Sequence, residues 1–317
     1  MKLTIDQILE KAFTTGDLAN GGLLKPDQAA TFVRGIFDAA VISKECRREP
    51  MNANTKQIDK ITYAGAVLQK PTAVGTTHTT TTKPTTSKVT LVAKEVLVAV
   101  DIGYDSLEDN IEKGNLFDTI MALTQAKMGP ELDDLILYGD TEGATGGVRD
   151  QVDGLFKLVS THSYDANQAT LSDTILKGGY RQLPGKYADS EKDLRFYVSH
   201  LARLDYVGAL AAKGVNEAFV RYLLEAQEPL YQGIPVRKVG AITTDNIATG
   251  SVAVYGSKGL LINPRNIILG IHRDFMFEME RKPRARIIEV TITMRLDVQL
   301  EEEDAVVKIT KIKHSTD

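Results

Sequence analysis

The sequence has almost no cysteine and no long hydrophobic run, and each shortage excludes a class of protein. Cys46 is the only cysteine, so no disulfide can form within the chain, which is typical of a reducing compartment. No apolar run approaches the roughly 20 residues that a membrane span needs, and the amino-terminal residues lack the apolar core of a signal peptide. The formal charge of −4 argues against a protein whose main surface clamps nucleic acid.

Motifs that carry chemistry are also lacking. The five histidines have no spacing typical of zinc ligands, and residues 179–186 have one residue too many for a phosphate loop. Cys46 lies beside two arginines, but no histidine or asparagine partner is apparent. The acidic turn 301–304 could attract a cation, although such turns are usually solvated, and we favour solvation here. We therefore predict no catalytic residue, no cofactor and no metal.

What the chain does have is an ordinary globular composition with one unusual segment. Its 317 residues are 43% apolar and 25% charged, which suits one large or two ordinary folded domains. Residues 72–90 contain ten threonines and no acidic, aromatic, leucine or isoleucine residue. Threonine favours an extended backbone, but this segment has too little apolar area for a core of its own. By composition it is equally an arm that reaches outside the chain or a disordered, glycosylated linker.

The segments that flank the threonines indicate a hairpin. Residues 58–70 and 89–102 are rich in valine, isoleucine and threonine, and we expect them to form the two legs of a long hairpin whose tip is the threonine-rich part. A two-stranded hairpin is only marginally stable alone in water, so contacts outside the protomer should support it. Towards the amino terminus, residues 4–13 predict a short helix, and a second apolar stripe ends near Val41.

A long helix and a mixed α/β region follow. Helical spacing covers residues 106–138, with a kink or interruption expected at Gly129-Pro130. A glycine-rich loop follows at 140–155. Beyond it, short strands and helices alternate to residue 270, with strands expected at 194–199, 234–239, 252–255 and 267–271 and a helix at 201–210.

The carboxy-terminal pattern is the clearest in the chain. From Ile288 to Leu300 apolar and polar residues alternate without a miss, which predicts a strand with one buried and one solvated face. We expect residues 301–304 to turn and 305–312 to return as an antiparallel partner, with the helix 106–138 covering the apolar face. The fold class predicted is α+β.

Two basic clusters allow two interpretations. One contains Lys44, Arg47 and Arg48, and the other contains Arg281, Lys282, Arg284 and Arg286. Interleaved glutamates favour solvated ion-pair faces. The functional alternative is contact with acidic surfaces of neighbouring chains.

The order of these parts resembles the major capsid protein of tailed double-stranded-DNA bacteriophages, over nearly the whole chain. The most similar stretches are Ile111–Gly139, Val152–Leu155, Leu230–Val236 and Val254–Ile271. The resemblance implies an N-terminal arm (1–57), an extended loop (58–102), a spine helix in a peripheral domain (103–150), an axial domain (151–268) and a peripheral β hairpin (269–317).

The resemblance also implies a structural role without catalysis. Such proteins form hexamers and pentamers that close an icosahedral shell around DNA, which they enclose without sequence-specific binding and without a membrane. The protein is then expected in the virion, after assembly in the host bacterial cytoplasm with a portal protein, cement proteins and, because the chain starts at Met1 with a short arm, a separate scaffolding protein. The candidate inter-subunit contact residues are Thr79, Thr80, Thr81, Thr82, Lys83, Lys88, Arg47, Arg48, Arg281 and Arg284.

Some relatives join subunits by an isopeptide bond between a loop lysine and an asparagine of the peripheral domain. Lys83 and Lys88 are available, but no asparagine follows Asn266, so we predict no such bond.

Two alternatives stay open. The same architecture also serves as the shell of an encapsulin-like nanocompartment, which would hold cargo protein instead of DNA. An enzyme with an unrecognised site in residues 155–270 is the third hypothesis, and it predicts a deep pocket with convergent titratable groups.

Overall fold

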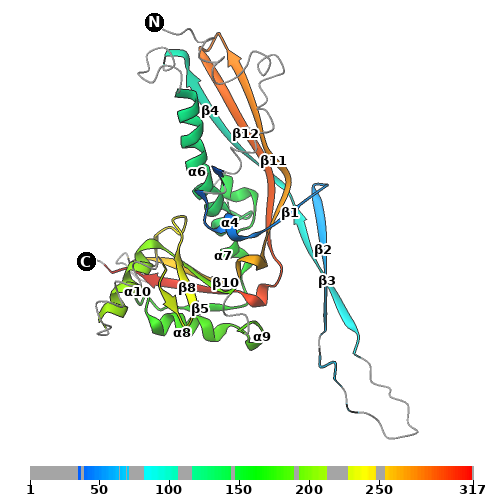
Figure 1. The fold of residues 1–317 in the computed structure, drawn as a ribbon, viewed down its shortest axis with the longest axis vertical. Coiled ribbons are helices and arrows are strands. Elements are labelled where there is room, and N and C mark those ends of the chain that lie inside the picture. The colour runs from blue at the N-terminus through cyan, green and yellow to red at the C-terminus, as the bar shows by residue number, and fades with distance from the viewer. Residues whose placement is uncertain are drawn as a thin grey trace.

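The computed structural model describes residues 35–36, 39–63, 65–68, 70, 82–105, 116–143, 147–188, 193–212, 228–247 and 254–315. The expected helix at 4–13, the start of the long helix at 106 and the threonines up to Thr81 lie outside these residues. A long sheet with a helix along it, a second sheet and a projecting hairpin make up the molecule (Figure 1).

The first sheet has four strands in the order β1-β11-β12-β4. Its centre is an antiparallel pair, β11 (Ile267–Lys282) and β12 (Ile287–Leu300). β4 (Lys94–Gly103) runs antiparallel along the other edge of β12, and β1 (Arg47–Pro50) runs parallel to β11. The buried face predicted for β12 is confirmed, because its apolar residues from Ile288 to Leu300 are all buried. The solvated face predicted opposite it is wrong, because Thr293 and Asp297 are buried there and the other polar residues are half-buried.

The terminal hairpin predicted for residues 288–312 is wrong. β13 (Val307–Lys313) does not return along β12 but pairs antiparallel with β10 of the second sheet. The reason is that β11 and β4 already occupy both hydrogen-bonding edges of β12. The chain therefore crosses from one sheet to the other through the short 3₁₀ turn η4 (Glu303–Ala305).

The helix α6 (Leu116–Tyr138) covers the apolar face of the first sheet, as predicted (Figure 1). Met128 packs with the apolar residues of β12 nearest the far end of the sheet, and Leu132 and Ile136 pack with Met294 and Leu296. The helix is continuous through Pro130, so the interruption expected at this position does not occur.

Two features of α6 hold the amino-terminal segment in place. A side chain at Gly129 would come within 2.6 Å of the Ile36 carbonyl oxygen, so glycine permits the close approach of that segment. The buried carboxylate of Asp133 accepts hydrogen bonds from the backbone N–H groups of Val41, Ile42 and Ser43, at 2.6, 3.1 and 2.9 Å. These N–H groups lie at the start of the short helix α4 (Ile42–Glu45). The first backbone N–H groups of a helix have no acceptor within the helix, and here Asp133 supplies one.

The hairpin exists, but its second leg is not the one predicted. β2 (Thr55–Tyr63) pairs antiparallel with β3 (Pro84–Val92), and the expected leg over 89–102 is split at Ala93. Beyond Ala93 the chain enters β4, whose valines pack against the core below α6. Burial of that apolar face outweighs continued pairing with β2.

The second sheet has the order β5-β13-β10-β6-β8-β7, with β9 on β10. Its strands are β5 (Ser163–Asp165), β6 (Arg195–Val198), β7 (Leu230–Tyr231), β8 (Ile234–Lys238), β9 (Asp245–Asn246), β10 (Tyr255–Ile262) and β13. The strands expected at 194–199 and 234–239 are confirmed. Of the strand expected at 252–255, residues 252 and 253 lie outside the described residues, Val254 belongs to no strand, and only Tyr255, the first residue of β10, is in a strand.

Helices accompany this second sheet, and short ones join it to the first. They are α7 (Leu155–Leu158), α8 (Asp173–Gln182), α9 (Gly185–Ala188) and α10 (His200–Ala212), with 3₁₀ turns η1 (Val148–Gln151) and η3 (Pro264–Asn266). The helix α10 confirms the prediction for 201–210. In the described part of the chain, no helix is long and apolar enough to cross a bilayer.

Candidate functional site: the projecting hairpin and the junction at its base

The hairpin has one face towards the body and one towards solvent. On the body side, Leu91 is fully buried and forms a small core with Met51, Ala93 and Ile268, against which Ile58 packs. The alternate residues point the other way because side chains alternate across a strand. At the distal end of that outward face, Ile61 is 68% exposed and Tyr63 is 56% exposed.

A buried carboxylate fixes the proximal end of β3. Asp297 of β12 accepts a hydrogen bond from the Val92 N–H at 2.7 Å and another from the Val298 N–H at 2.8 Å. Burial raises the pKa of Asp297 above its ordinary value, and the backbone hydrogen bonds oppose that rise. The end of β3 nearest the first sheet is thus fixed to β12 by a hydrogen bond to Asp297.

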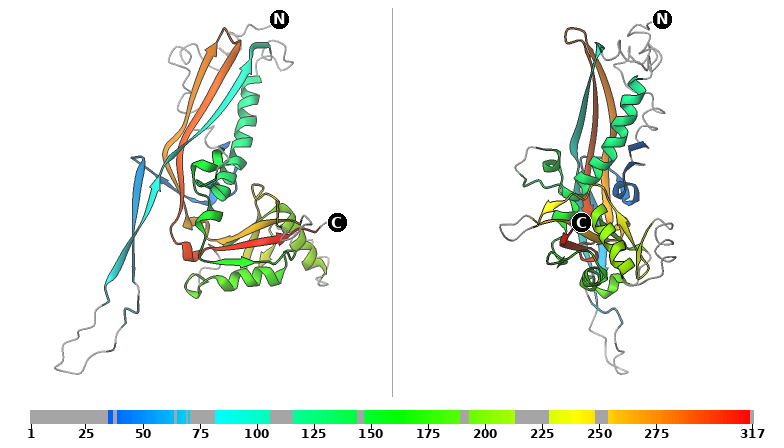
Figure 2. Two further views of the ribbon diagram at one scale, coloured as in Figure 1. Left: turned by 180° about the vertical axis from the view of Figure 1, so that it is seen from behind. Right: turned by 90° about the vertical axis from the view of Figure 1, so that its left-hand side faces the viewer.

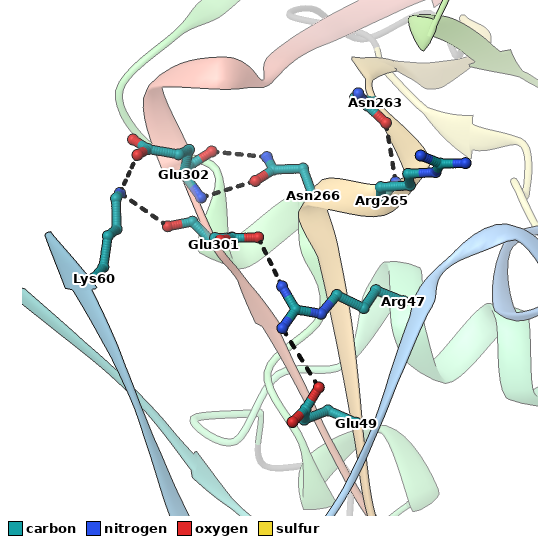
Figure 3. Close-up of polar contacts among 8 residues, drawn as sticks. All are labelled: Arg47, Glu49, Lys60, Asn263, Arg265, Asn266, Glu301 and Glu302. Carbon is teal, nitrogen blue, oxygen red and sulfur yellow. Dashed lines mark hydrogen bonds and ion pairs between the residues drawn. The ribbon is translucent and has the colours of Figure 1, made fainter. Parts of the chain in front are cut away.

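The acidic turn 301–304 forms a second attachment, here called the junction (Figure 3). Lys60 of β2 forms an ion pair with Glu302 and donates a hydrogen bond to the Glu301 carbonyl oxygen at 3.1 Å. The Glu301 carboxylate in turn accepts from Arg47 at 3.2 Å, and Arg47 lies 3.5 Å from Glu49. The junction therefore connects the hairpin, β1 and the crossover between the two sheets.

Neutral groups hold the turn itself. The Asn266 side chain accepts from the Glu302 N–H and donates to the Glu302 carbonyl oxygen, both at 2.8 Å, and Tyr187 donates to the Glu302 carboxylate at 2.9 Å (Figure 3 draws the asparagine pair). Burial alone would raise the pKa of Glu302, but hydrogen bonds from Lys60 and Tyr187 outweigh it and lower that pKa.

Glu303 shows that the expectation of a merely solvated turn is wrong. One oxygen of its carboxylate accepts from the side chain and backbone N–H of Ser160 at 2.7 and 2.9 Å, and from those of Thr161 at 2.8 and 3.0 Å. These donors, Ser160 first, lower the pKa of Glu303 to about 2. The carboxylates of this turn thus accept hydrogen bonds from other parts of the same chain. Among the described residues, no group of three side chains that could hold a metal ion occurs.

The predicted contact residues lie in three separate places. Arg47 belongs to the junction, and Arg48 donates to the Ser43 carbonyl oxygen at 3.4 Å. Arg281 donates to the Tyr104 hydroxyl at 2.6 Å, near the far turn of the β11–β12 hairpin, where Arg284 is exposed. Of the remaining candidates, Thr82, Lys83 and Lys88 belong to the projecting hairpin.

On the hairpin, Lys83 and Lys88 are exposed, and Thr82 donates to the Ala66 carbonyl oxygen at 3.0 Å. Thr79, Thr80 and Thr81 lie outside the described residues. The sequence reasoning missed Lys60, Glu302 and Asp297. Alternation along β2 could have placed Lys60 on the face towards the body, but no sequence pattern near Lys60 indicates that it pairs with Glu302.

The region 155–270 does contain a hollow. It measures about 1030 Å³ and lies between α8, α10 and β7, and its lining includes Tyr164, Asp173, Lys177, Arg181 and Tyr206. The described residues that line it include no histidine, cysteine or serine, so neither a Ser–His nor a Cys–His pair is assembled there. The hollow alone does not decide whether the protein is an enzyme.

Comparison with known proteins decides the class. In solved structures, the satellite phage P4 procapsid that includes the size determination (Sid) protein contains a chain with TM-score 0.63, at 12% identity over 95% of this chain and 97% of that one. The holo-SrpI encapsulin complex of Synechococcus elongatus PCC 7942 matches with TM-score 0.57, at 10% identity over 84% and 85%. At such identities the likeness shows the fold alone, which this chain shares with a chain of a phage procapsid and a chain of an encapsulin complex.

Sequence similarity carries the identification further. The chain is 33% identical over 311 residues to "Putative prophage capsid protein YqbE" of Bacillus subtilis (strain 168), covering 97% of this chain and 98% of that protein. No protein-family model matches the chain. The chain belongs to the family of phage major capsid proteins; it is a structural component of the capsid and not an enzyme.

Proposed function

We propose that this protein forms hexamers and pentamers that close an icosahedral shell around phage double-stranded DNA, and that the β2–β3 hairpin lies across a neighbouring subunit. The observation that carries the proposal is the hairpin itself. It projects beyond both sheets as two strands without a third (Figures 1 and 2). Such a pair is marginal alone, and its outward apolar side chains favour a partner surface.

The parts of the chain then take the following roles. Residues 1–57 are the arm, 58–102 the extended loop, 103–150 the spine region, 151–268 the axial domain and 269–317 the remainder of the peripheral domain. The pairing of β4 with β12 supports moving residues 94–103 from the loop to the peripheral domain. The crossover of β13 supports moving residues 307–313 to the axial domain.

Accessory proteins belong to the same proposal. The similar procapsid structure includes a size determination protein, which supports assembly of this fold with separate factors. We propose a scaffolding protein, a portal protein and cement proteins as partners, and assembly in the host bacterial cytoplasm. The predicted contact residues on the hairpin and in the basic clusters are proposed to face neighbouring subunits.

Electron microscopy tests the proposal directly. The purified protein, with its scaffold where one is encoded, should give closed icosahedral particles. Deletion of Thr76–Thr82, which spares both β2 and β3, should leave the circular dichroism spectrum of the protomer unchanged and abolish or weaken particle formation. Normal, equally stable particles from the deletion would contradict the role given to the hairpin, and a protein that stays monomeric throughout would contradict the shell.

A nanocompartment is the second candidate, favoured by the encapsulin match. Nuclease-protected DNA within particles from infected or induced cells would support the phage shell. Packaged cargo protein instead of DNA would support the compartment.

A further inference from the structure

The carboxy-terminal end of the described chain is attached both to the second sheet and to α10. Beyond β13, the His314 N–H donates to the Tyr255 carbonyl oxygen of β10 at 3.1 Å, which extends the pairing of β13 with β10. The Ser315 N–H donates to the Asp205 carboxylate of α10, also at 3.1 Å. These last residues thus lie beside α10 (Figure 1), and His314 lies where that helix meets the sheet.

The core next to this attachment is shared by the helix and the strand. Ala202 and Tyr206 of α10 belong to the same buried cluster as Ile309 and Ile312 of β13. Side chains two residues apart on a strand point the same way, so His314 continues the buried side of β13 after Ile312. Release of this end of the chain would therefore open one edge of the core between α10 and the sheet.

The imidazole of His314 is buried without a hydrogen bond. Its side chain is 4% exposed, and neither Nδ1 nor Nε2 has a hydrogen-bond partner among the described residues. A neutral imidazole carries one donor and one acceptor, and burying both of them unpaired costs free energy that an aliphatic side chain would not cost. Apolar packing alone therefore does not account for a histidine at this position.

Asp205 is the charged group that faces the ring. Its Oδ2 lies 4.0 Å from His314 Nδ1, beyond hydrogen-bond length, and already accepts from the Ser315 N–H. On the side of β10 the nearest titratable residue is Tyr255, whose side chain is exposed, and the Lys313 side chain points to the opposite face of β13. Burial lowers the pKa of His314 below its ordinary 6.5, and the Asp205 carboxylate opposes that fall without cancelling it.

We propose that His314 and Asp205 form a pH-dependent latch, which holds the end of the chain on α10 while the imidazole is neutral and releases it when the imidazole is protonated. An imidazolium at this position would lose its hydration and gain only a carboxylate that another donor already uses. The pKa of His314 is lower in the attached state than the 6.5 of an exposed histidine. The stabilisation is therefore fully present above pH 6.5 and is lost as the pH falls below that value.

Hydrogen exchange of the unassembled, full-length protein tests the latch. After correction for the intrinsic pH dependence of amide exchange, the protection of α10 and of residues 307–315 should fall several-fold between pH 7.5 and pH 5.5. The ceiling is about tenfold, because a released histidine with a pKa of 6.5 is protonated about ten to one at pH 5.5. His314→Leu, which has no titrating side chain, should remove this pH dependence.

Three further variants sharpen the test. His200→Gln removes the exposed histidine that begins α10 and should keep the pH dependence of the parent. Asp205→Asn keeps an acceptor for the Ser315 N–H but removes the charge that stabilises the imidazolium, so the loss of protection should grow towards the ceiling. His314→Gln, which is neutral at both pH values, repeats the test if the leucine variant does not fold.

The latch is overturned if the parent shows no change in protection with pH, or if the variants at position 314 keep the change that the parent shows. A smaller loss in Asp205→Asn than in the parent would overturn the part given to the Asp205 charge. The measurement involves no particles, so none of these results bears on the proposed shell.

Discussion

At the scale of residues, the carboxylates of Glu302 and Glu303, at the crossover from β12 to β13, and the side chain of Asn266, at the end of η3, connect the parts of the molecule. Glu302 forms an ion pair with Lys60 of the hairpin, and the Asn266 side chain forms hydrogen bonds with both the N–H and the carbonyl oxygen of Glu302. Glu303 meets the segment after α7 through four hydrogen bonds. Because ionised acceptors make stronger hydrogen bonds than neutral ones, the negative charge of Glu303 is part of the joint.

Glu303→Gln should therefore destabilise the protein by about 1–2 kcal/mol at pH 7. The pKa of Glu303 is lower in the folded protein, at about 2, than the ordinary 4.5, so its stabilisation is fully present above pH 4.5 and is lost as the pH falls towards 2. Urea unfolding at pH 7 and pH 3 checks this, and the difference between variant and parent should shrink at pH 3. Glu142→Gln is the control, because the Glu142 side chain is 86% exposed. A loss independent of pH would contradict the role of the charge.

At the scale of elements, α6 is where the first sheet and the amino-terminal segment meet. One face of the helix buries the apolar side of β12 and β4, and Gly129 and Asp133 receive the segment that leads into α4. Glycine is a poor helix former, so its presence in the middle of α6 has a packing reason.

Two matched glycine substitutions separate packing from helix propensity. Gly129→Ala should destabilise the protein by about 1–3 kcal/mol, because the new methyl group would lie 2.6 Å from the Ile36 carbonyl oxygen and 2.8 Å from the Ala39 Cβ. Gly208→Ala in α10 should stabilise it by about 0.5–1 kcal/mol, since nothing lies within 4 Å of the new atom. Thermal unfolding of both variants measures the two effects. A Gly129→Ala variant that is more stable than the parent would contradict the prediction, because the segment containing Ile36 and Ala39 would then have moved aside without a loss of stability.

At the scale of the whole molecule, contacts between copies must hold the shell. The hairpin is fixed at its base by the junction and by Asp297, and its distal part is free to meet a neighbour. Many such weak contacts act together in a closed assembly, so none has to be strong or covalent.

Assembled particles boiled in detergent with reductant should accordingly run as one band near 34.7 kDa. Lys83 and Lys88 lie on the hairpin, but no asparagine follows Asn266 to complete an isopeptide bond. A ladder from unmodified particles would contradict this prediction.

The sequence by itself determined the elements whose side-chain pattern is local. Alternation from Ile288 to Leu300 predicted the strand β12, and helical spacing predicted α6 across Pro130, though not its continuity. The threonine-rich segment between two β-prone stretches predicted a hairpin, and the order of the parts indicated the capsid family.

Only the tertiary structure decided which strand edges meet and which charges pair. Edges are formed by backbone groups that every residue carries, so the side-chain pattern could not show that β12 takes β4 while β13 takes β10. Lys60 lies 241 residues before Glu301, and no local pattern relates residues so far apart. The acidic turn looked solvated in sequence because its donors, Lys60, Asn266, Ser160 and Thr161, reach it only when the two sheets are folded together.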